Sequence, residues 1–132
     1  MKEMVYQVHR IKEILDEGYY RDIRYVILNL GTHPTAYVEN IVNAKEWNDD
    51  ILDNIEVHGG FTWCDLPHWQ EDKRVVYLGW DYAHCDDYDG YNVLFNDNSG
   101  KKWTTKEVLE EVHYVIDQLL ELKEKINERD NL

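Results

Sequence analysis

Apolar residues near the start of the chain recur every three or four positions, at Met4, Val8, Ile11 and Leu15. This spacing places them on one side of a helix, so it predicts an amphipathic helix over residues 3–17. Gly18 follows directly, and a glycine after the last periodic residue is a typical helix end.

The middle of the chain has the character of strands. The sequence IRYVILNL at residues 23–30 is almost continuously apolar and rich in branched side chains, which predicts a buried strand. Two further strands are expected at 55–64 and 74–82, joined by a polar connection that contains Pro67. Residues 41–53 have a weaker apolar pattern, which favours a short helix.

The clearest pattern lies near the end of the chain. Thr104 and Glu107 have the spacing of a capping box, in which each side chain bonds a backbone amide at the start of a helix. An apolar stripe follows, which predicts an amphipathic helix over residues 104–127. The stripe comprises Val108, Val112, Ile116, Leu119 and Leu120.

These elements predict an α+β fold in a single domain. A small, mainly antiparallel sheet is packed by the long C-terminal helix, and an N-terminal helix is added to it. The expected segments are the N-terminal helix at 1–18, the core containing the sheet at 23–82, an acidic loop at 83–102 and the C-terminal helix at 104–127.

Charge and length narrow the possible partners. The chain has 132 residues and a formal net charge of −13, which argues against a nucleic-acid or anionic-membrane partner. No apolar run is long enough to span a bilayer and no signal peptide opens the chain, so we expect a cytoplasmic protein. Two cysteines cannot define a disulfide framework. Ten tyrosines and five tryptophans exceed what a minimal core needs.

The stretch VHGGFTWC at residues 57–64 places two glycines inside a predicted strand. Strand glycines often mark a bulge or a close approach to the backbone. If the two strands pair so that their apolar rows match, His58 lies opposite Asp81 and Gly60 opposite Gly79. The glycines then form a bare floor bounded by an imidazole and a carboxylate.

The sequence DYAHCDDYD at residues 81–89 adds His84 and Asp87 to that end of the hairpin. These groups can run acid–base chemistry, with His58, His84 and Asp81 as the catalytic residues. They can also hold a cation, with Asp87 as a fourth ligand, although no established metal motif is present. A solvated acidic turn is the simpler alternative.

A tight turn at Gly31 and Pro34 presents His33, Thr35 and Tyr37 at the end of the first predicted strand. Loops at strand ends often carry ligand-binding groups on a rigid scaffold. An incidental turn explains the same residues.

Three ordered motifs resemble a family of small proteins associated with bacteriophages and prophages. The first is G-x-H-P followed by a tyrosine, one residue later than expected; the second is V-H-G-G-x-T-aromatic; the third is G-aromatic-D-x-A-H-x-x-D. The matching residues are Gly31, His33, Pro34, Tyr37, Val57, His58, Gly59, Gly60, Thr62, Trp63, Gly79, Trp80, Asp81, Ala83, His84 and Asp87. The resemblance covers roughly residues 25–120 and implies an accessory role against host defence.

We therefore expect a homo-oligomeric protein that binds and sequesters a small nucleotide-like signalling ligand; the sequence identifies no cofactor. The expected ligand-binding residues are His33, Tyr37, His58, Gly59, Gly60, Thr62, Trp63, Asp81, His84 and Asp87. One alternative is a nucleotide hydrolase or phosphodiesterase, with or without a metal. Another is an acidic inhibitor of a protein interaction.

Overall fold

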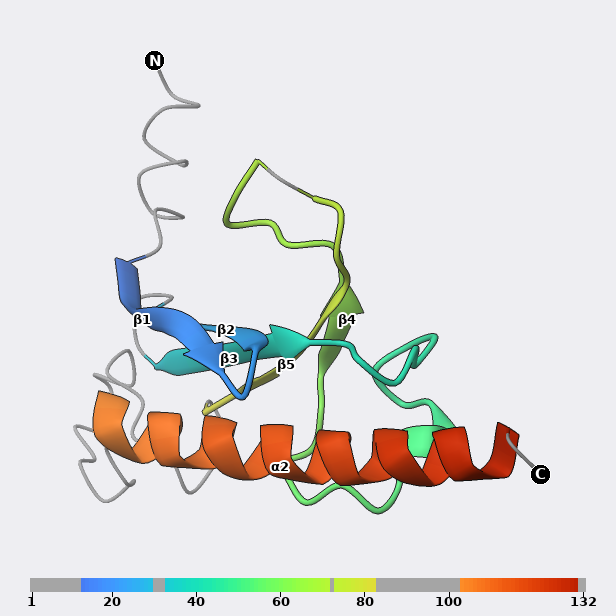
Figure 1. Cartoon of the computed structure of the whole chain (residues 1–132). Coiled ribbons are helices and arrows are strands. Elements are labelled where there is room, and N and C mark those ends of the chain that lie inside the picture. Colours follow the sequence, from blue (N-terminus) through green and yellow to red (C-terminus); the bar gives the residue numbers. More distant parts are fainter. Residues whose placement is uncertain (1–12, 30–32, 72, 83–102, 131–132) are drawn as a thin grey trace.

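The computed structural model describes residues 13–29, 33–71, 73–82 and 103–130. Five strands, one short 3₁₀ helix and one long α-helix make up this part of the chain (Figure 1). In chain order the elements are β1 (Glu13–Tyr20), β2 (Ile23–Asn29), β3 (Pro34–Glu39), η1 (Asp50–Leu52), β4 (Trp63–Asp65), β5 (Tyr77–Asp81) and α2 (Thr105–Asp130).

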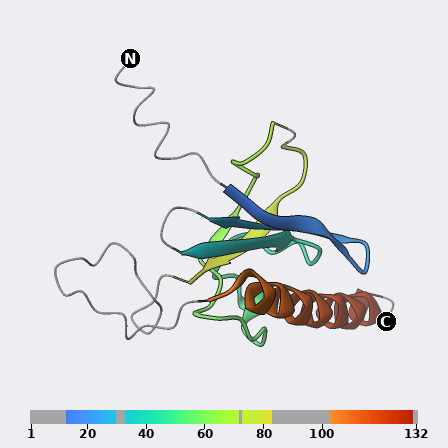
Figure 2. The ribbon, with the colours of Figure 1, turned by 90° about the vertical axis from the view of Figure 1, so that its left-hand side faces the viewer.

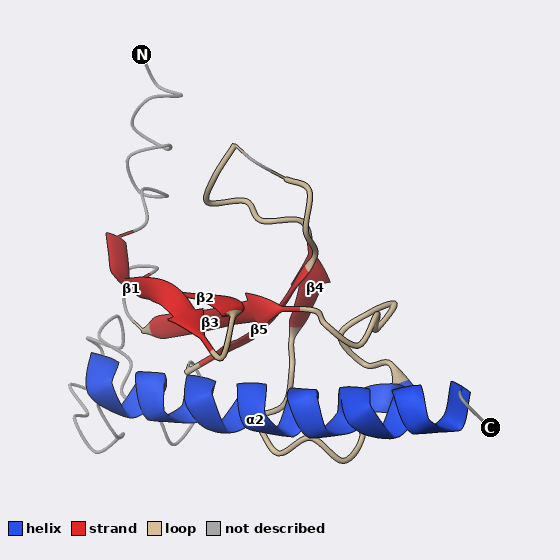
Figure 3. Cartoon of the chain, viewed as in Figure 1, coloured by secondary structure: helices blue, strands red, loops and turns tan. Residues whose placement is uncertain are grey.

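The strands form one antiparallel sheet in the order β1-β2-β3-β5-β4. Helix α2 runs across one face of this sheet, so the fold has two layers (Figures 1 and 2). The predicted α+β architecture, an antiparallel sheet packed by a long C-terminal helix, is confirmed. The opposite face, called the open face below, carries the connection between β4 and β5 (Figure 3).

The start of the sheet differs from the prediction of a helix over residues 3–17. Residues 13–17 belong to strand β1, and Gly18 lies within that strand opposite Tyr25; residues 3–12 lie outside the described residues. Arg21 and Asp22 have φ of 51° and 68°, so they form a two-residue hairpin turn with both central residues left-handed. Pairing with the apolar strand β2 overrides the helical spacing in this stretch.

Strand β2 confirms the buried strand expected at 23–30. Strand β3 was not predicted. The sequence pattern indicated a turn that carries His33, Thr35 and Tyr37, but Thr35 and Tyr37 lie within this strand. Pro34 begins the strand, a position where its missing N–H group is tolerated. Strand β3 then lies between β2 and β5 at the centre of the sheet.

The expected hairpin of 55–64 and 74–82 forms only in part, and its predicted register is wrong. Only Trp63–Asp65 and Tyr77–Asp81 are strands, and Gly79 lies opposite Trp63 rather than opposite Gly60. His58 lies in a turn, and Asp81 lies opposite Thr35 of β3. The predicted cross-strand pair of His58 with Asp81 is therefore absent.

The short helix expected at 41–53 is also wrong, apart from η1. The Asn40 side chain bonds both the amide and the carbonyl of Ala44, at 3.0 and 2.7 Å. The Asp49 carboxylate accepts the amides of Lys45 and Ile51, at 2.7 and 3.1 Å. These short polar side chains satisfy the backbone locally, which removes the need for helical hydrogen bonds.

Helix α2 begins as the capping box predicted. Thr104 Oγ1 accepts the amide of Glu107 at 3.2 Å, and Glu107 Oε1 accepts the amide of Thr104 at 3.1 Å. The apolar stripe packs on the sheet, with Val108, Val112, Ile116 and Leu119 fully buried against residues such as Ile27, Val38, Leu78 and Trp80. No helix among the described residues is long and apolar enough to cross a membrane.

Polar contacts orient the helix on the sheet. Trp80 Nε1 donates to the Tyr82 hydroxyl at 3.0 Å, and that hydroxyl donates to Glu111 Oε1 at 2.7 Å. At the sheet edge, the Tyr20 ring stacks on His113 with 4.0 Å between centroids. These contacts connect both ends of the sheet to one helix.

The two glycines of the VHGG stretch allow the chain to turn at residues 58–60. Gly59 and Gly60 have φ of 69° and 80°, a region that disfavours side chains, and the Gly60 amide bonds the Val57 carbonyl at 2.9 Å. A Cβ on Gly60 would meet no atom within 4 Å. The glycines are therefore required by backbone geometry at this turn.

Gly60→Ala should lower the free energy of unfolding by about 1–2 kcal/mol, the cost of a left-handed alanine. Gly60→Asn should cost less, because asparagine tolerates this region better. Urea denaturation of both variants measures the difference. An alanine variant as stable as the wild type would show that the positive φ is not required.

Candidate functional site

The centre of the open face is built on Tyr37, whose ring covers Gly79. A Cβ on Gly79 would lie 2.7 Å from Tyr37 Cδ1, so only glycine leaves room for the ring. Tyr37 and Gly79 are cross-strand partners, and a ring over a strand glycine compensates for the missing side chain. The bare floor that the sequence predicted at Gly79 is thus filled from within the protein.

Four aromatic side chains surround Tyr37. Trp63 meets its ring edge-on at 5.2 Å between centroids, and Trp69 lies 4.2 Å away at a tilt of 39°. The Tyr37 hydroxyl lies 3.2 Å from His68 Nε2, and Trp69 also contacts Tyr77 edge-on at 5.2 Å. These five residues are called the aromatic cluster below. They attach the connection between β4 and β5 to the open face.

Burial within this cluster changes the chemistry of Tyr37. Loss of solvent, with a smaller effect of the Asp81 carboxylate, raises the pKa of Tyr37 to about 12. The phenol therefore stays protonated at neutral pH and acts as a hydrogen-bonding group, which suits a structural role.

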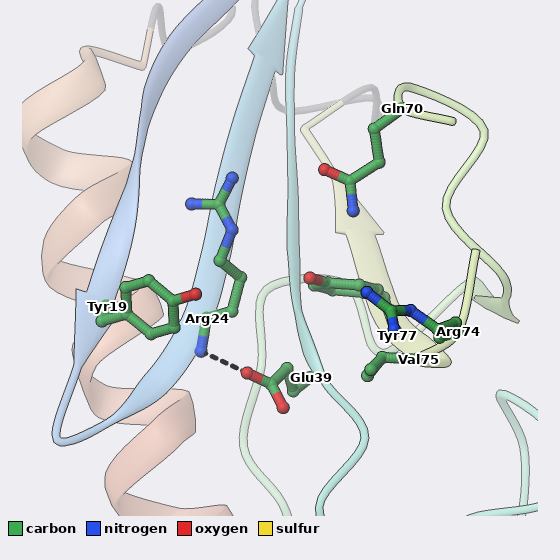
Figure 4. A pocket seen from close by; sticks show the side chains of 7 residues that line it. All are labelled: Tyr19, Arg24, Glu39, Gln70, Arg74, Val75 and Tyr77. Atoms are coloured by element: carbon green, nitrogen blue, oxygen red, sulfur yellow. Dashed lines mark hydrogen bonds between the residues drawn. The ribbon is translucent and has the colours of Figure 1, made fainter. Parts of the chain in front are cut away.

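One end of the open face holds a cavity of about 370 Å³ (Figure 4). Its floor is a row of side chains that crosses four adjacent strands: Tyr19 on β1, Arg24 on β2, Glu39 on β3 and Tyr77 on β5. The register places Tyr19 opposite Arg24 and Glu39 opposite Tyr77. The wall comes from the β4–β5 connection and consists of Gln70, Arg74 and Val75.

Hydrogen bonds hold the floor in place. The Arg24 amide donates to Glu39 Oε1 at 2.8 Å, and the Arg24 guanidinium pairs with Glu17 at 2.6 Å. The same guanidinium lies 5.6 Å from the centroid of the Tyr19 ring. Arg24 is therefore oriented by its neighbours before any ligand arrives.

The guanidinium of Arg24 also lies close enough to act on the charge state of Tyr77. Burial raises the pKa of Tyr77, and the nearby positive charge of Arg24 opposes that rise. Arg24 and Arg74 place two positive charges at this cavity, and Glu39 places one negative charge there.

The other end of the open face is polar. Asp81 lies opposite Thr35, and its Oδ2 accepts the Thr62 hydroxyl at 3.3 Å. Thr35 is buried, and neither its hydroxyl nor Nδ1 of His33 has a hydrogen-bond partner among the described residues. Buried polar groups are usually hydrogen-bonded, so two buried polar atoms without a partner among the described residues are an exception.

The structure brings only some of the predicted site residues together. Tyr37, Trp63 and Asp81 share the open face, and Thr62 bonds Asp81. His58 instead stacks on Tyr82, at 4.6 Å between centroids, on the side of the core that faces α2. His84 and Asp87 lie outside the described residues, as does the whole of the acidic loop at 83–102.

None of the predicted residues lines the cavity in Figure 4. Its lining was missed because the row combines one residue from each of four strands, and no local motif marks it. One signal was present in the sequence, the basic residue Arg24 within a predicted apolar strand.

The described residues contain neither a group of metal ligands nor a reactive thiol, and two of the predicted metal ligands, His84 and Asp87, lie outside them. Among the residues that the structure describes, no three His, Cys, Asp or Glu side chains form a group that can hold a metal ion. Burial, followed by the charge of Asp65, raises the pKa of the Cys64 thiol. A raised pKa makes this cysteine a poor nucleophile.

Gly79→Ala should lower the free energy of unfolding by about 1–3 kcal/mol, because the added methyl group overlaps the Tyr37 ring. Gly18→Ala is the matched control, since its Cβ would come no closer than 3.3 Å to its nearest neighbour, the Tyr25 hydroxyl. That control should cost less than Gly79→Ala. Chemical denaturation compares them, and equal stabilities would contradict the close packing of Tyr37 on Gly79.

Comparison with known proteins returned no match, whether among family models, curated proteins or solved structures. The function of this chain must therefore be inferred from the chemistry of the open face.

Proposed function

We propose that the protein binds a small nucleotide-like ligand in the cavity of Figure 4. The observation that carries this proposal is the placement of two guanidinium groups and two tyrosine rings around one cavity. Arginines bind phosphate oxygens through charged hydrogen bonds, and tyrosines stack on flat rings. A nucleotide offers both kinds of group in one molecule.

Arg24 and Arg74 are the phosphate-binding residues of this proposal. Arg24 lies on the floor of the cavity, and Arg74 lies on its wall in the β4–β5 connection. A phosphate between them would be contacted from two sides. The Arg24 guanidinium is held by Glu17, which lowers the cost of ordering this side chain on binding.

Tyr19 supplies the stacking surface. Tyr19 is 70% exposed, whereas Tyr77, at the other end of the floor, is buried. A base stacked on Tyr19 would cover that ring and gain about 1–3 kcal/mol. The volume of about 370 Å³ is near the lower limit for ligand sites, which favours one nucleotide unit.

The lining favours binding over catalysis. Among the described residues that line the cavity, Glu39 is the only carboxylate and there is no histidine, and Glu39 already accepts the Arg24 amide. The biological role we propose is sequestration of a signalling nucleotide by a phage-type accessory protein. That role is supported by the ordered sequence motifs alone.

Arg24→Gln and Arg74→Gln should each weaken binding of nucleoside monophosphates by about 10- to 100-fold, the value of a charged hydrogen bond. Arg21→Gln is the matched control, because Arg21 pairs with Asp117 of α2 outside the cavity. Isothermal titration calorimetry measures all three. Affinities that fall equally in the control, or in none of the variants, would refute the proposed site.

Sequestration and hydrolysis differ in what becomes of the ligand. We expect a nucleotide incubated with the protein to be recovered intact after denaturation and chromatography. A shortened or dephosphorylated product would show that the protein is an enzyme.

A further inference from the structure

We infer that the nucleotide bound in this cavity carries a guanine base, which Glu39 recognises. This inference rests on the proposed function, since it specifies the ligand of the same cavity. It starts from the carboxylate of Glu39, which lies in the middle of the floor that we propose binds phosphate. Phosphate binding does not explain a negative charge at this position.

Glu39 is placed to accept hydrogen bonds from a ligand. Its Oε1 accepts the Arg24 amide at 2.8 Å, which fixes the carboxylate between Arg24 and Tyr77 (Figure 4). Within the described part of the chain, its other oxygen has no hydrogen-bond donor, because the Arg24 guanidinium pairs with Glu17 instead. An ionised carboxylate offers about four acceptor positions on two oxygens, so most of its capacity remains.

Among the common bases, guanine matches a carboxylate best. Its N1–H and exocyclic amino group are adjacent donors, and they can bond the two carboxylate oxygens together. Adenine and cytosine present an amino group beside an acceptor nitrogen, which a carboxylate repels. Uracil presents one N–H between two carbonyl groups. Only guanine therefore pairs both oxygens without a repelled neighbour.

A site that hydrogen-bonds one base discriminates strongly, because a wrong base leaves the polar group of the site unpaired.

The test is calorimetry of the full chain with the monophosphates of guanosine, inosine, xanthosine, adenosine and cytidine. We expect guanosine monophosphate to bind tightest. Inosine monophosphate lacks the amino group and should bind about 10-fold more weakly, and the adenosine and cytidine compounds about 100-fold more weakly.

Glu39→Gln tests the residue itself. Its amide oxygen still accepts the Arg24 amide, so the fold should be retained, which circular dichroism checks. The variant should lose about 10- to 100-fold in affinity for guanosine monophosphate and should bind xanthosine monophosphate more tightly than the wild type does. Asp65→Asn is the matched control, since Asp65 lies opposite Tyr77 but does not line the cavity.

The outcomes separate the two proposals. Binding of all bases with similar affinity, or a preference for another base, overturns the role of Glu39 while leaving nucleotide binding intact. Equal effects of Glu39→Gln and Asp65→Asn also overturn it. Absence of binding by every nucleotide in the panel overturns the proposed function together with this inference.

Discussion

The packing of the Tyr37 ring on Gly79 determines what the open face of the sheet becomes. A five-stranded sheet with one helix has a second face that must be covered or left to water. Here Gly79 has no side chain, Tyr37 fills that space, and Trp69 packs on the outer side of the Tyr37 ring. The result is a local aromatic core that needs no second helix.

This core has a consequence for function. Trp69 belongs to the connection between β4 and β5, and its contacts with Tyr37 and Tyr77 hold that connection against the sheet. Gln70, Arg74 and Val75 follow in the same connection and form one wall of the cavity. The other surface is the row across the strands, so the cavity exists only because an irregular segment is attached to a regular sheet.

Sequence patterns predicted the parts of the fold that depend on local spacing. The buried strand β2, the capping box at Thr104 and the apolar stripe of α2 all follow from residues close together in the chain. The predictions failed for two different reasons, pairing with a distant strand in one case and local side-chain hydrogen bonds in the other. The pattern at residues 13–17 suits a helix, but pairing with β2 makes it a strand, and Asn40 and Asp49 replace an expected helix with side-chain hydrogen bonds.

The residues of the candidate site were also predicted only in part. Glycines 59 and 60 suggested a ligand floor, but their positive φ angles explain them. Asp81 lies in a strand as predicted, whereas Tyr37 was expected in a turn and lies in strand β3, on the same face as Asp81. The row from Tyr19 to Tyr77 depends on the register of four strands, which no single stretch of sequence encodes.

The central claim is that the cavity above this row binds a nucleotide. It is tested most directly by ¹H–¹⁵N correlation spectra of the protein during titration with guanosine monophosphate. The account predicts shifts that saturate at the amides of Tyr19, Arg24, Glu39, Tyr77 and residues 70–75, with little change along the second half of α2. Spectra that do not change, or shifts confined to α2 or to the turn at His58–Gly60, would contradict it.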